Sequence, residues 1–212
     1  INAKSTSGGA VGVGRESEAT GSNSVAMGKK AKATDSNAVG VGYEAEATKA
    51  NTVAMGRKVY ANTAGSVALG SNATASNTGA IAIGGYTGNS ANTTASGDNS
   101  VALGVSTTAD GDNSIAMGRN VTASAESAIA IGKDAVSNKK NAVALGSGSN
   151  TSSAATVQSS TTIGGKTYSW NKGVLPTTDS DGRQISVGTS GFERQIKNVA
   201  AGEISANSTD AI

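Results

Sequence analysis

A four-residue motif recurs ten times in the first 146 residues: Val or Ile, then Ala or Gly, then a large apolar residue, then Gly. Successive motifs are 14 residues apart, except for one interval of 20 residues between Gly84 and Gly104. A fixed period of this kind indicates a repeat architecture in which each coil stacks on its neighbours. The repeat-defining glycines are Gly14, Gly28, Gly42, Gly56, Gly70, Gly84, Gly104, Gly118, Gly132 and Gly146.

Each repeat contains two stretches that alternate with the period of a β-strand. In the first, Val25 and Met27 point to one side, and Ser24 and Ala26 to the other. In the second, small residues such as Ala31 and Ala33 alternate with exposed, often charged ones. Asn23 and its equivalents precede the next strand, where a turn needs left-handed backbone. The pattern predicts an all-β solenoid of 14-residue coils, rising about 4.8 Å per coil and about 50 Å in total.

The first strand of every coil carries no charge on either face, so we expect both faces to be covered. We assign the large Val and Met side chains to the chain's own second strand, and the small face to contacts with identical subunits. The reverse assignment, with Val and Met at the subunit contact, stays open. The candidate subunit contacts on the small face are Ala26, Ala54, Ala68, Ala82, Ala102, Ala116, Ala130 and Ala144.

Charges alternate in sign from coil to coil on the second strand and the turn before it. One column contains Glu16, Lys30, Glu44 and Lys58, and the next contains Glu18, Lys32 and Glu46. We expect opposite charges to stack on neighbouring coils and to fix their register, because exposed pairs add little stability. A solvated face without such a role is the alternative.

Composition excludes several classes of protein. The chain has no His and no Cys, which rules out Ser-His triads, thiol nucleophiles and zinc–thiolate sites. Its 17 basic and 15 acidic residues are interspersed, unlike the basic stripe of a nucleic-acid-binding protein. We therefore expect no enzyme activity, no cofactor, no metal and no nucleic acid. An ice-binding solenoid is disfavoured because the threonine column of Thr20, Thr34 and Thr48 breaks at Asn62.

The remainder departs from the 14-residue period. The six extra residues before Gly104 predict a loop around Tyr86 that projects from the rod. We divide the chain into a head of repeats (1–146), a connector and insert with short strands (147–183), and a C-terminal segment (184–212). Around Gly164 and Gly165 we expect a turn between two strands, with Trp170 buried. No apolar run reaches the roughly 20 residues that a membrane-spanning helix needs.

The repeat Asn23-Ser24-Val25-Ala26-Met27-Gly28 resembles those in the heads of YadA-like trimeric autotransporter adhesins. Residues 193–202, Glu-Arg-Gln-Ile-Lys-Asn-Val-Ala-Ala-Gly, with Ser-Thr-Asp-Ala-Ile at 208–212, resemble the neck of that family. The resemblance implies a left-handed parallel β-roll, a homotrimer, and a neck that leads to a coiled-coil stalk. It also implies that Trp170, Arg194 and Asn198 lie at contacts between subunits.

The same resemblance implies an exposed head on the outer membrane of a Gram-negative bacterium, held there by an anchor domain that this fragment lacks. The implied activity is multivalent attachment to host matrix proteins or cell-surface receptors, and autoagglutination. The candidate ligand surface is Arg15, Lys29, Lys30, Lys58 and Tyr86. The alternative is a spacer that projects a distal adhesive domain without binding anything itself.

Overall fold

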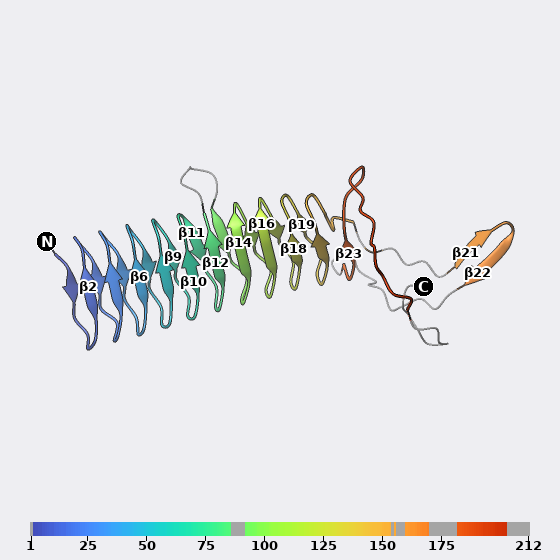
Figure 1. Cartoon of the computed structure of the whole chain (residues 1–212). Coiled ribbons are helices and arrows are strands. Elements are labelled where there is room, and N and C mark those ends of the chain that lie inside the picture. The colour runs from blue at the N-terminus through green and yellow to red at the C-terminus, as the bar shows by residue number, and fades with distance from the viewer. Residues whose placement is uncertain (1, 86–91, 154, 156–159, 170–181, 203–212) are drawn as a thin grey trace.

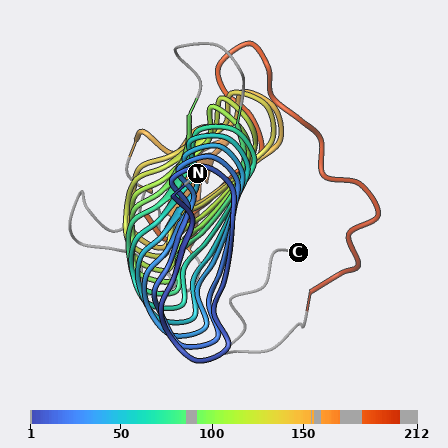
Figure 2. The same cartoon turned by 90° about the vertical axis from the view of Figure 1, so that its left-hand side faces the viewer.

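The computed structural model of the chain is a rod of stacked coils, with a separate strand pair beyond its C-terminal end (Figure 1). It describes residues 2–85, 92–153, 155, 160–169 and 182–202. Seen along the rod, the coils stack into one flattened tube (Figure 2). Strands are the only regular elements among the described residues, so the all-β parallel solenoid predicted from the period is confirmed.

Two parallel sheets form the broad walls of the tube, and each coil contributes one strand to each. The first sheet consists of β1 (Lys4–Ser5), β3 (Glu18–Ala19), β5 (Lys32–Ala33), β7 (Glu46–Ala47), β9 (Tyr60–Ala61), β11 (Ala73–Ala75), β13 (Thr93–Ala95), β15 (Thr108–Ala109), β17 (Thr122–Ala123) and β19 (Val136–Ser137).

The motif strands form the second sheet. They are β2 (Val11–Val13), β4 (Val25–Met27), β6 (Val39–Val41), β8 (Val53–Met55), β10 (Val67–Leu69), β12 (Ile81–Gly84), β14 (Val101–Val105), β16 (Ile115–Arg119), β18 (Ile129–Ile131) and β20 (Val143–Leu145), followed by β23 (Ile185–Ser186).

Every coil pairs with the next in register, so equivalent residues form columns along the rod. Val25 lies beside Val39, and Glu18 beside Lys32. Two turns close each coil, and both include left-handed backbone, for example at Glu16 (φ 61°) and Asn23 (φ 55°). Asparagine tolerates this conformation well, which explains its recurrence before the motif strands.

The core between the sheets consists of small side chains, and this corrects our assignment of the faces. The alanines that we placed at subunit contacts are 0% exposed within a single chain, so they cannot touch another subunit: Ala26, Ala54, Ala68, Ala82, Ala102, Ala116, Ala130 and Ala144. They lie in one core cluster with Ala33 and Ala47 of the opposite sheet. The large residues of the motif point outward instead, as in the reverse assignment.

The physical reason is volume. Small residues on the inner faces of both sheets let the walls approach closely, and the largest fully buried side chains of the described chain are Val59 and Val121. A tube of this width has no room for Met27 or Leu69, because protein interiors are packed to the density of organic crystals.

The solenoid extends past Gly146, where we expected the period to end. Ser149 and Thr151 occupy inward positions of a further half coil and are 0% and 1% exposed, and Asn150 bridges Val136. The chain then leaves the rod and returns with β23, which pairs in parallel with β20. The last coil is therefore closed by residues that lie far along the chain from its first half.

Between these two segments lies an antiparallel pair, β21 (Ser160–Ile163) and β22 (Lys166–Ser169). Gly164 and Gly165 form its turn with φ of 59° and 81°, as the sequence led us to expect. Ile163 and Tyr168 on it are exposed at 67% and 47%. The pair has no strand neighbour in the described chain.

Candidate functional site

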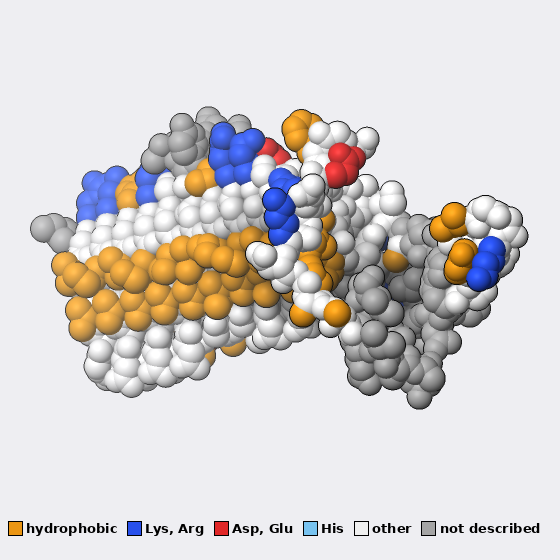
Figure 3. All heavy atoms as spheres, turned by 45° about the vertical axis from the view of Figure 1, so that its right-hand side comes forward, with side chains coloured by type: hydrophobic (Ala, Val, Ile, Leu, Met, Phe, Trp, Pro, Cys, Tyr) orange, Lys and Arg blue, Asp and Glu red, His pale blue; other side chains and the backbone are white. Residues whose placement is uncertain are grey.

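The outer face of the second sheet carries two columns of large apolar side chains, which we call the apolar band. Each motif strand contributes its first and third residues, such as Val25 and Met27 of β4. Figure 3 shows them as two adjacent rows along the rod. Val13, Met27, Met55 and Leu145 are exposed at 53%, 43%, 44% and 46%. An uninterrupted apolar strip of this length is unusual on a monomer and marks an interaction surface.

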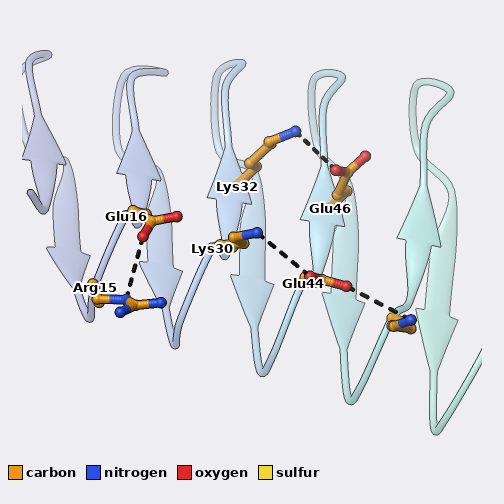
Figure 4. A network of polar contacts seen from close by, with 7 residues as sticks. Arg15, Glu16, Lys30, Lys32, Glu44 and Glu46 are labelled. Atoms are coloured by element: carbon orange, nitrogen blue, oxygen red, sulfur yellow. Dashed lines mark hydrogen bonds and ion pairs between the residues drawn. The ribbon is translucent and has the colours of Figure 1, made fainter.

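The opposite wall carries the alternating charges, which we call the charge ladder: Glu16, Lys30, Glu44 and Lys58 in the turns, and Glu18, Lys32 and Glu46 on β3, β5 and β7. Figure 4 shows the side chains reaching from coil to coil. Lys32 Nζ lies 2.8 Å from Glu46 Oε1, and Glu44 lies 3.9 Å from both Lys30 and Lys58. Opposite charges therefore stack on neighbouring coils, as predicted.

The hydrogen bond from Lys32 to Glu46 is the main reason that the pKa of Lys32 is raised above its ordinary value. Burial is the next largest effect and lowers the pKa, and charge attraction to Glu46 and then to Glu18 raises it. Glu16 instead contacts Arg15 of its own coil at 3.2 Å. These groups line an open groove and stay in contact with solvent.

A basic edge precedes the charge ladder. Lys29 Nζ lies 5.5 Å from the centre of the Tyr43 ring, within cation–π range. A hydrogen bond with Glu44 raises the pKa of Tyr43. The candidate ligand residues Arg15, Lys29, Lys30 and Lys58 thus share one edge of the rod. Tyr86 lies outside the described residues. Tyr43 belongs to this edge although the sequence did not single it out, and it contacts Glu44 of the predicted charge column.

Arg194 closes the C-terminal end of the tube within its own chain. Its guanidinium donates to the carbonyl oxygens of Val187 at 2.7 Å and Ser147 at 2.6 Å, and to Ser149 Oγ at 3.3 Å. These contacts link the last half coil to the returning segment. Asn198 is exposed with left-handed backbone (φ 59°), and Trp170 lies outside the described residues.

The described residues offer no cluster of three His, Cys, Asp or Glu that would hold a metal ion. They form no helix that is long and apolar enough to span a membrane. The groove along the charge ladder and the one beside it at the N-terminal end of the rod are open to solvent. What the surface offers is repetition: two apolar columns on one wall and two charged columns on and beside the other.

Comparison with known proteins gives one family. The model of the YadA head domain repeat matches residues 5–31, 19–39, 33–58, 64–87, 95–120 and 123–149. A search of curated proteins found no match.

Two solved structures are similar. The collagen-binding domain of the Yersinia adhesin YadA has 24% identity, a TM-score of 0.52, and coverage of 92% of this chain and 81% of that one. The C-terminal YadA-like domain of BPSL2063 from Burkholderia pseudomallei has 49% identity over 40% of this chain, with a TM-score of 0.33. The chain spans 37% of the length of the latter.

Proposed function

The chain belongs to the YadA head domain family, and on this premise we propose that it is the head of a trimeric surface adhesin. In this proposal the head attaches bacteria to host extracellular matrix proteins or cell-surface receptors, and the bacteria to one another. The similar fold of a collagen-binding domain supports an adhesin-type function. The proposal places the chain on the outer membrane of a Gram-negative bacterium, without catalytic activity.

The observation that carries the proposal is the apolar band. Ten coils each leave two large apolar side chains outside the single chain, in a strip about 48 Å long at about 4.8 Å per coil. Three chains around a common axis would remove all three strips from water at once. The opposite wall, which carries the charge ladder, would then face outward on every subunit.

Attachment in this arrangement depends on repetition. Three equivalent basic edges, each with Arg15, Lys29, Lys30 and Lys58, would present many weak contacts to an extended ligand such as a matrix fibre. Linking weak contacts raises their effective concentration and therefore the avidity, without a deep pocket. The division into head, insert and neck (184–212), with a stalk to follow, is part of the same proposal, and the roll of the head extends past residue 146 to Thr151.

The test is a solid-phase binding screen of the chain against collagen, fibronectin, laminin and host cells, with sedimentation to confirm the trimer. We expect saturable binding to at least one of these, reduced when Arg15 and Lys29 are both replaced by Ala. The matched control replaces Lys139 and Lys140 by Ala on another turn. Binding to none of them would favour the spacer role, and binding unchanged by the Arg15 and Lys29 substitutions would remove this edge as the ligand surface.

A further inference from the structure

The charge ladder is complementary to a second copy of itself that runs in the opposite direction. The turn column runs Glu16, Lys30, Glu44, Lys58, so an antiparallel copy runs Lys, Glu, Lys, Glu beside it. We propose that this wall docks face to face and antiparallel on the same wall of a second copy of the chain, so that the ladder is a self-recognition surface. The inference rests on the proposed trimer only in that the trimer leaves this wall exposed.

A two-fold axis perpendicular to the rod, between the coils of Lys30 and Glu44, generates the pairing. It brings Glu16 opposite Lys58 of the second copy, and Lys30 opposite Glu44. On the first sheet, Lys32 comes opposite Glu46, because these two residues are also neighbours in register on either side of the axis. Symmetry forms each of these three pairs twice, so one contact has six ion pairs.

In the fourth coil an uncharged residue, Tyr60, provides the partner for Glu18. Tyr60 lies beside Glu46 at the place where the second column would need its next lysine. The same axis brings Glu18 of one copy opposite Tyr60 of the other, whose hydroxyl donates to a carboxylate. Every charge of the ladder therefore meets an opposite charge or a hydrogen-bond donor.

The same ladder rejects other arrangements. Parallel docking at equal height places Glu16 on Glu16 and Lys30 on Lys30, and an antiparallel slip by one coil also places like charges together. Such contacts cost free energy, so the surface specifies both direction and register. The later coils carry threonines, such as Thr108 and Thr122, in place of the charges of the first sheet, which restricts docking to the N-terminal part of the rod.

The charged residues are available for such contact. The lysine side chains of the ladder are exposed at 42–47%, and those of Glu44 and Glu46 at 27%. They lie on the wall opposite the apolar band, whose burial in a trimer would leave them in solvent. Their pairing within the chain is incomplete, because the contacts of Glu44 with Lys30 and Lys58 are 3.9 Å long.

The backbone supplies an independent argument. Glu16, Lys30, Glu44 and Lys58 all have left-handed backbone, with φ between 53° and 61°. Glycine, asparagine and aspartate suit this conformation; Asn72, Asn120 and Asp134 occupy the equivalent position in three later coils, and Ser106 occupies it in another. Four successive coils thus use residues that suit the turn poorly. A departure from local preference of this kind points to a role for the charges themselves.

The test uses beads of two colours that carry the chain by its C-terminal end. The variant exchanges the six charges at once: Glu16→Lys, Lys30→Glu, Glu44→Lys, Lys58→Glu, Lys32→Glu and Glu46→Lys. It keeps the net charge and the alternation of charge from coil to coil, and it creates two exposed like-charge contacts, at Glu18 beside residue 32 and at Arg15 beside residue 16. The control exchanges the ion pair of Glu126 and Lys140 on another turn, whose atoms lie 2.7 Å apart.

We expect the original chain to cluster with itself and the exchanged chain to cluster with itself. Mixed clusters should be roughly tenfold fewer, because the exchange places like charges opposite each other. Clustering should also fall in 1 M salt, where the screening length is about 3 Å. The control should cluster freely with the original chain.

Mixed clusters as frequent as single-colour ones would overturn the proposal. Clustering that is unchanged in 1 M salt would also overturn it. If circular dichroism shows that the variant with six substitutions is unfolded, the single variant Lys30→Glu replaces it in the test. It places residue 30 opposite Glu44 of the second copy twice, as two like-charge contacts, and should weaken clustering. Loss of matrix binding with clustering intact would count against the proposed function and leave this inference standing.

Discussion

The tightest constraint on the coil is the glycine that ends each motif strand, and Gly104 gives the strongest test. Its φ is +134°, and a Cβ at this position would lie 1.7 Å from the carbonyl oxygen of Gly118 on the next coil. That oxygen accepts a hydrogen bond of 2.8 Å from Thr107 Oγ1, which is 0% exposed. Gly104→Ala must therefore strain its own backbone and also displace a neighbouring coil.

The cost of Gly104→Ala follows from these two effects. Backbone held in a region that only glycine favours costs about 1–3 kcal/mol. Loss of a partner for a buried hydroxyl costs about 1–3 kcal/mol. We therefore expect the free energy of unfolding to fall by roughly 4 kcal/mol, which corresponds to a drop in melting temperature of about 8–16 °C for a chain of this length.

Two other glycines provide controls. Gly148 has φ of +70° and open space around the added Cβ, so Gly148→Ala should cost only about 1–2 kcal/mol of left-handed strain. Gly8 has neither restriction, so Gly8→Ala should change stability by less than about 0.5 kcal/mol. Thermal unfolding followed by circular dichroism at one protein concentration measures all three. Equal losses for Gly104→Ala and Gly148→Ala would refute the claim that contact between coils requires this glycine.

Three further predictions concern the band, one carboxylate and the end of the rod. Met55→Asp places a charge in the apolar band and should lower the trimer fraction at least tenfold in sedimentation. The control Thr122→Asp, on the opposite wall, should leave the trimer fraction unchanged. Equal effects of the two substitutions would contradict the proposed interface. Hydrogen bonds lower the pKa of Asp134, the one from Lys133 more than the one from Asn120. The stability that this carboxylate adds is therefore present above its ordinary pKa, and it is lost as the pH falls through the lowered pKa of the folded state. Asn120→Ala should raise that pKa in an NMR titration, and an unchanged midpoint would exclude the Asn120 bond as a cause. Arg194→Ala should speed amide exchange in the last half coil and leave β8 and β10 unaffected; uniform acceleration would show a global role instead.

The sequence predicted the coils, their turns and the stacking of charges, because each of these depends on residues close together in a repeated unit. Our assignment of the facing of the motif strand was wrong, because alternation shows that Val25 and Met27 share a side but not which side is inside. The deciding signal was the pairing of two small-residue rows, such as Ala26 and Ala33, which fixes a narrow tube. A row of large residues is then left outside.

The return of β23 could not be predicted from the period. It depends on Ser149 and Thr151 occupying inward positions, and on a partner strand some 40 residues away from β20 in the chain. The hairpin was recognisable because its turn is local and contains two glycines. The self-complementarity of the charge ladder is visible in the sequence only after the register of the coils is known.

The way in which β23 closes the last coil also sets where the head is mechanically weakest. A pull on the C-terminal end enters the roll through two residue pairs with β20, the hydrogen bonds of Arg194, and a few further hydrogen bonds such as those of Asn150 with Gly188 and Thr189. The coils behind them are joined by unbroken ladders along both sheets. Under tension the last coil should therefore detach first. Its unfolding would lengthen the chain while the rest of the rod keeps its shape.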